Sequence, residues 1–173
     1  MSKFKHMKSF VKILIITTIV LLSGFSCQKI ESLPVIPLIS FKSFILKDTT
    51  DALGNEGKIG ELTFDFEDGD GDIGLTQPDS LSVDSTNFNL FFTLFGKIDG
   101  DFIEVSENDL ETPLNYRIPY IEKEGQNKAL KGEIQIDFIY LLFEYDTFKY
   151  SFYLVDRALH KSNVETTPEI IMF

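Results

Sequence analysis

The residues with the clearest potential for chemistry form an acidic run between Glu61 and Gly74, which reads ELTFDFEDGDGDIG. Three aspartates, Asp68, Asp70 and Asp72, alternate there with glycines. Carboxylates this close repel one another unless water or a cation lies between them. Calcium suits such a loop because it is a hard ion that takes about 6–8 oxygen ligands from flexible segments. The run therefore predicts a calcium site with these three aspartates as ligands.

A second interpretation of the acidic run stays open, because Asp-Gly pairs are also good formers of solvated turns. The run is not an EF-hand: counted from Asp68 as the first ligand, Ile73 stands at the sixth position, where that motif needs glycine. A strand followed by an aspartate-rich loop remains, and it is similar to the calcium loops of bacterial cadherin-like sandwich domains. Extracellular modules bind calcium with dissociation constants on the order of 10⁻⁴–10⁻³ M.

Composition limits the functions open to this chain. Its 173 residues carry 27 acidic and 16 basic side chains, a net charge of −11. This charge argues against a nucleic-acid partner, whose phosphates are neutralised by Lys and Arg. One Cys excludes an intrachain disulfide framework and Cys-rich metal sites. His160 is the only His beyond position 6, and no nucleophile elbow, phosphate loop or zinc spacing occurs, so we predict a non-enzymatic protein.

The first 26 residues differ from the rest of the chain. Four lysines are their only charged residues, and an apolar stretch from Ile13 to Leu22 and small residues follow, which is the order of a secretory signal. The sequence LSGFSC at 22–27 resembles a bacterial lipobox, in which Cys27 becomes the lipidated first residue. Phe25 departs from the usual small residue, as the looser boxes of Bacteroidota lipoproteins allow. Removal of this segment leaves a net charge of −15.

The secondary-structure elements that must position the acidic run are predicted to be β-strands. After an extended tether at 27–37, apolar and polar side chains alternate in three segments, 62–66, 134–138 and 148–154. Residues 88–95 are apolar on both faces, as in a central strand. Weaker strand patterns cover 38–47, 102–105, 115–121 and 164–172, and the one helix candidate is 139–144. Asp99-Gly100 predicts a hairpin turn. We expect one all-β domain over 38–173, an antiparallel β-sandwich of immunoglobulin or fibronectin III type with seven to eight strands.

Asp156 follows the 148–154 segment and is a candidate fourth calcium ligand. In a seven-strand sandwich, the loop after the second strand and the loop before the last strand lie at the same end. Asp156 would then approach the three aspartates of the acidic run, whereas an eighth strand between them would send the two loops to opposite ends. The alternative for Asp156 is a local pair with Arg157 or Lys161.

The acidic DGDGDIG loop, the lipobox and the segment 153–163 together resemble small, uncharacterised Ig-like lipoproteins of Bacteroidota. The segment YLVDRALHKSN is similar to the V-x-D-x-A-G-N-x-S ending of the penultimate strand in bacterial Ig-like domains, with Leu159 and His160 in place of Gly-Asn. The resemblance implies a β-sandwich held at a membrane by a lipid on Cys27. Gln28 differs from the Asp of inner-membrane retention signals, which favours the outer membrane, on its periplasmic side or at the cell surface.

From these features we expect a non-enzymatic binding or accessory module whose partners are the membrane and an envelope protein or glycan. One alternative is a structural envelope lipoprotein whose calcium loop stabilises the fold. A more remote one is a carbohydrate-active enzyme that uses a pair of carboxylates.

Overall fold

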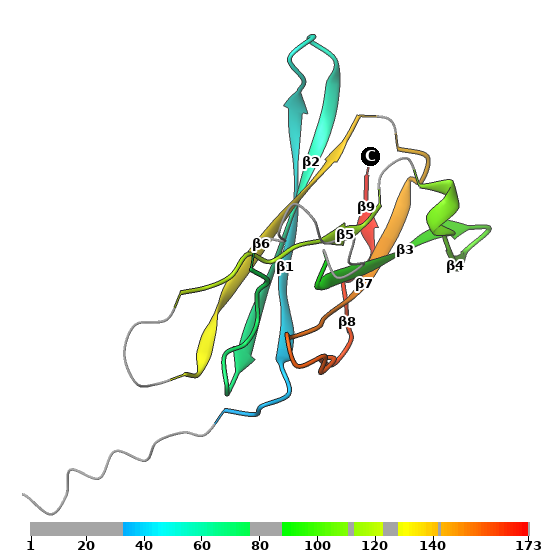
Figure 1. The fold of residues 1–173 in the computed structure, drawn as a ribbon. Helices are drawn as coiled ribbons and strands as arrows, with labels where there is room; N and C mark the ends of the chain where they lie inside the picture. The colour runs from blue at the N-terminus through cyan, green and yellow to red at the C-terminus, as the bar shows by residue number, and fades with distance from the viewer. Residues whose placement is uncertain (1–32, 77–87, 111–112, 123–127, 142, 173) are drawn as a thin grey trace, which may run out of the picture. The chain divides into compact units, whose positions relative to one another are not determined.

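The computed structural model describes residues 33–76, 88–110, 113–122, 128–141 and 143–172. In these ranges nine strands form two antiparallel sheets, of three and six strands, in a β-sandwich-like arrangement (Figure 1). The only helical turn among them is a short 3-10 turn at Glu107–Asp109. None of the described residues form a helix with the length and hydropathy needed to cross a membrane. The predicted signal at 1–26, Cys27 and Gln28 lie outside the described residues.

The three-stranded sheet has the order β1-β2-β6, with bounds Leu38–Thr50, Glu56–Asp68 and Leu130–Tyr140. β1 and β2 form a long hairpin in which Leu38 is opposite Glu67. The end of β2 therefore lies beside the start of β1. Asp68, the last residue of β2, is thus close to the first described residues of the chain.

The six-stranded sheet has the order β4-β3-β7-β8, with β5 also paired to β3 and β9 to β7. The bounds are β3 Leu90–Ile98, β4 Asp101–Glu104, β5 Asn115–Tyr116, β7 Thr147–Leu154, β8 Glu165–Thr166 and β9 Ile170–Ile171. The predicted hairpin between β3 and β4 is confirmed: Asp99 and Gly100 both have positive φ, 52° and 95°, as type I′ turns require. β3 lies between β4 and β7, as predicted for a central strand, but only its inward side chains are fully buried.

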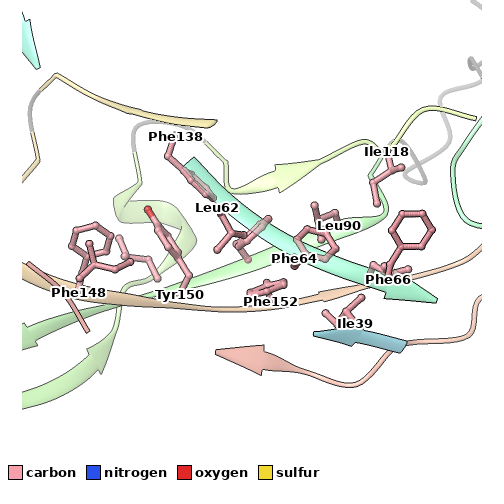
Figure 2. Close-up of a cluster of buried hydrophobic side chains, with 14 of the residues drawn as sticks. Ile39, Leu62, Phe64, Phe66, Leu90, Ile118, Phe138, Phe148, Tyr150 and Phe152 are labelled. Carbon is pink, nitrogen blue, oxygen red and sulfur yellow. The ribbon is translucent and has the colours of Figure 1, made fainter. Parts of the chain in front are cut away.

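The core lies between the sheets and is rich in aromatic rings. The alternation predicted for β2 and β7 is confirmed, since the inward side chains of each strand are buried while their neighbours are more exposed. Figure 2 shows these side chains meeting between the strands. The rings of Phe64 and Phe152 are 5.2 Å apart, and those of Phe138 and Tyr150 are 4.7 Å apart. Aromatic burial of this extent holds the two sheets together without a disulfide.

Several local expectations were wrong. The count of nine strands exceeds the predicted seven to eight, because the expected strand over 164–172 is divided into β8 and β9. Thr167, between them, exchanges two hydrogen bonds with the backbone of Tyr150, and Pro168 has no N–H to donate to the ladder. The helix expected at 139–144 is absent from the described residues there, since β6 continues to Tyr140.

Candidate metal centre

The candidate centre begins at Asp68, the last residue of β2. Its side chain is 0% exposed, which is rare for a carboxylate without a charged partner. Oδ2 accepts a hydrogen bond of 2.9 Å from the backbone N–H of Ile73, five residues later. Gly71 has a φ of 62°, a conformation open to glycine at little cost, and it lets the chain turn back so that this bond can form. The Asp-Gly sequence thus curls the loop around the end of the strand.

The loop brings three carboxylates together. One oxygen each from Asp68, Asp70 and Asp72 lies within 4.8 Å of the others. The second oxygen of Asp72 accepts a hydrogen bond of 3.1 Å from the backbone N–H of Ala158. Oδ1 of Asp68 and Oδ1 of Asp72 are buried, and neither accepts a hydrogen bond from any residue that the structure describes. Two of the carboxylates thus use one oxygen to bind backbone and leave the other without a hydrogen bond from the described residues.

The electrostatics of the cluster follow from this geometry. Burial raises the pKa of the Asp68 carboxyl above its ordinary value of 3.8, and the neighbouring Asp70 raises it further, while the hydrogen bond from Ile73 lowers it. Burial also raises the pKa of Asp72, with added repulsion from Asp156 and Asp70. In the absence of a cation, the ionised cluster therefore destabilises the folded state.

The connection that follows β7 forms the opposite side of the cluster. The backbone N–H of Arg157 donates to the carbonyl of Asp72 at 3.3 Å, and its Nη1 donates to the carbonyl of Gly74 at 2.7 Å. The two loops therefore meet at one end of the domain, the arrangement expected for the seven-strand case. β4 and β5 both pair antiparallel with β3 and so run in the same direction, which means that the extra strand β5 does not send the two loops to opposite ends.

Asp156 lies close enough to raise the pKa of Asp72, but it is not among the three converging carboxylates. Its side chain is buried, and both of its oxygens contact His160: Oδ1 accepts from the backbone N–H at 2.7 Å, and Oδ2 lies 2.9 Å from Nδ1. The local pair that the sequence left open is thus made with His160 instead of Arg157 or Lys161. Asp156 contributes negative potential to the cluster, and its oxygens shape the turn.

Sequence reasoning missed a third segment that contacts the acidic loop, and this segment is the end of the predicted tether. The backbone N–H of Gly69 donates to the carbonyl of Pro34 at 2.7 Å. A Cβ at position 69 would overlap the carbonyl of Leu33, so this glycine is needed for close approach of two backbones. The Pro-containing sequence indicates an extended segment, but no signal in it points to Gly69 as its contact. The end of the tether is therefore part of the acidic site.

The donor set fits a hard cation. Three carboxylates supply charge, and a buried oxygen without a hydrogen bond has a coordination position to fill. Water and backbone carbonyls would complete the shell, as they do in most calcium loops. The comparisons with protein-family models, with curated proteins and with solved structures gave no match for this chain.

Proposed function

We propose that this chain is a lipid-anchored, non-enzymatic β-sandwich module of the bacterial outer membrane, in which a calcium ion orders the end of the domain where β1 begins and β2 ends. The strand order supports an immunoglobulin or fibronectin III-like fold. β1, β2 and β6 correspond to strands A, B and E of such sandwiches, and β4, β3, β7 and β8 correspond to C′, C, F and G.

The observation that carries the calcium proposal is the carboxylate of Asp68. It is fully buried, one of its oxygens accepts no hydrogen bond within the described residues, and two further carboxylates converge on the same point. A buried charged oxygen left unsatisfied costs stability. A divalent cation supplies the missing ligand contact and offsets the repulsion among the three aspartates. A solvated turn would leave these oxygens in contact with water instead of burying them.

The position of the site supports a role for calcium in orienting the domain. The acidic loop contacts the tether through Gly69 and Pro34 and contacts the turn after β7 through Asp72 and Ala158. All three segments meet at the lower end of the domain in Figure 1. Cys27, the proposed lipidation site, precedes Leu33 by only six residues. Calcium would therefore hold Leu33 and Pro34, which follow the proposed lipidation site closely in the sequence, against the body of the domain.

Thermal unfolding with and without calcium tests this site. Addition of calcium to the EDTA-treated chain should raise the melting temperature, and Asp70→Asn should remove most of that rise. Asp65→Asn is the matched control, because Asp65 lies on β2, the strand that leads into the acidic loop, but its side chain is half exposed on the outer face. An equal melting temperature in calcium and EDTA would contradict the calcium site.

Metabolic labelling with palmitate in a bacterial host tests the anchor. Labelling should be lost in Cys27→Ala and retained in Ser26→Ala, which keeps a small residue before the cysteine. Labelling that persists without Cys27 would contradict the lipoprotein assignment and would leave the calcium result unaffected.

A further inference from the structure

The outer face of the six-stranded sheet carries aromatic rings. Along β3 and β7 the inward residues form the core, and the alternate residues point away from it. Phe91 of β3 and Tyr153 of β7 are paired across the sheet, with their rings stacked at 5.2 Å and 21°. Phe95 of β3 and Phe102 of β4 lie on the same face, and all four side chains remain partly exposed. The face thus carries two pairs of partly exposed aromatic side chains, which form two aromatic sites.

Each aromatic site has a lysine above it. Nζ of Lys161 lies 3.6 Å from the ring centre of Tyr153. Nζ of Lys149 lies 4.4 Å from the ring centre of Phe102 and 5.6 Å from that of Phe95. Neither ammonium group has a carboxylate within ion-pair distance among the described residues. The rings are attractive neighbours for these cations, but they do not neutralise their charge.

The other lysines in the strands of the sandwich provide a comparison, because they form ion pairs with carboxylates. Each described lysine in the strands of the three-stranded sheet forms an ion pair with a carboxylate, and so does Lys97 of β3; those of the three-stranded sheet are Lys42, Lys47, Lys58 and Lys131. In a chain with 27 acidic residues, carboxylate partners are abundant. Two lysines that share one face and have no such partner therefore mark that face as complementary to an external anion.

We propose that the outer face of β3, β4 and β7, with Phe91, Tyr153 and Lys161 at one site and Phe95, Phe102 and Lys149 at the other, binds an acidic polysaccharide. This inference rests on the proposed function as a lipid-anchored module of the outer membrane, to which it adds a ligand, and it does not require calcium. Sugar rings have flat apolar faces that stack on aromatic side chains. A uronic acid carboxylate would draw each ammonium group off its ring and so expose the ring to a sugar.

The spacing of the two sites favours a polymer over a single small anion. Lys149 and Tyr153 are four residues apart on β7, which corresponds to about 13 Å at the rise of an antiparallel strand. A linear glycan with a carboxylate on every second sugar can contact both sites at once, and the two contacts then reinforce each other through their high effective concentration. Two separate aromatic and cationic sites on one sheet face suit such a chain better than they suit a small ligand.

The test measures binding of the full chain in detergent micelles to hyaluronan oligosaccharides, in which alternate sugars carry a carboxylate, by calorimetry in EDTA. We expect binding that is about tenfold weaker for Lys149→Gln or Lys161→Gln and weaker still for the double variant, since each loses a charge-assisted contact. Lys47→Gln with Lys58→Gln is the control, because it changes the net charge equally on the other sheet and should leave the affinity unchanged. Dextran, a neutral glycan, should not bind.

Three outcomes would overturn the proposal. The first is that the wild type does not bind hyaluronan, or that the two double variants bind it with equal affinity. The second is poly-glutamate binding as tight as hyaluronan binding, which would identify an acidic polypeptide as the partner. The third is binding that needs calcium and is lost in Asp70→Asn, which would assign the glycan to the acidic loop. The calcium-dependent melting shift is measured separately, so failure of the glycan site and failure of the proposed function remain distinguishable.

Discussion

Replacement of Asp68 by Asn tests the cation site directly, because it should change stability in opposite directions with and without calcium. Asn has almost the same shape, and its carbonyl oxygen can still accept the hydrogen bond from Ile73. Its amide group would take the position of the oxygen that has no partner and could donate to the neighbouring carboxylates. The variant thus removes a buried charge while it keeps the loop geometry.

The magnitude follows from the separation of the carboxylates. For two unit charges at the 4.8 Å limit of the cluster, an effective dielectric of 20 gives a repulsion of about 3.5 kcal/mol. Protonation at the raised pKa of Asp68 and the partial exposure of Asp70 and Asp72 relieve part of it. We therefore expect the variant to be more stable than the wild type in EDTA by about 2 kcal/mol, or about 6 °C in melting temperature for a domain of this size.

Calcium should reverse the order. At a dissociation constant on the order of 10⁻⁴ M, 10 mM calcium, about a hundredfold excess, adds about 2.7 kcal/mol to the wild type. The variant lacks a ligand and should gain little. The wild type should then melt slightly above the variant, whereas in EDTA it melts below it.

The assay is thermal unfolding followed by circular dichroism, with wild type, Asp68→Asn and the control Asp65→Asn in EDTA and in calcium. Asp65→Asn should follow the wild type in both conditions. An Asp68→Asn chain that is less stable than the wild type in EDTA, or that retains the full calcium-induced rise, would refute the reasoning.

Three further predictions concern the same end of the domain. In EDTA, the stability of the wild type relative to Asp68→Asn should increase as the pH falls toward 3.8, because the raised pKa makes the folded state bind the proton first; urea unfolding over a pH series measures this. Gly69→Ala should destabilise the domain by about 1–3 kcal/mol and speed proteolysis at 33–37, because its Cβ would overlap the carbonyl of Leu33; unchanged cleavage would contradict the contact. Asn163→Ala should cost about 1–2 kcal/mol in denaturant unfolding, since its side chain bonds both the N–H and the C=O of Ile39 at 2.8 and 2.9 Å; Asn163→Asp should cost at least as much, because a carboxylate oxygen would then face the carbonyl of Ile39 and the carboxylate of Glu165, neither of which can donate to it.

Local patterns were good predictors of the regular parts of the fold. Alternation in β2 and β7 identified their buried faces, because the side-chain period of a strand is a property of its backbone. The Asp99-Gly100 pair identified a hairpin because a two-residue turn needs positive φ, which few residues other than Gly, Asn and Asp adopt easily. The split of the last strand into β8 and β9 could not be predicted, because it depends on Thr167 reaching the backbone of Tyr150 across the sheet.

The candidate site likewise has some features that the sequence predicted and others that depend on tertiary packing. The sequence alone predicted that Asp68, Asp70 and Asp72 can converge, since alternating glycines allow a tight loop and the aspartates are two residues apart, but it left a solvated turn open. Only the tertiary structure decided that Asp68 is fully buried, that His160 occupies both oxygens of Asp156, and that Gly69 contacts the tether. These features depend on which distant backbone groups the folded chain brings to the loop. Spacing along the sequence carries no information about that packing.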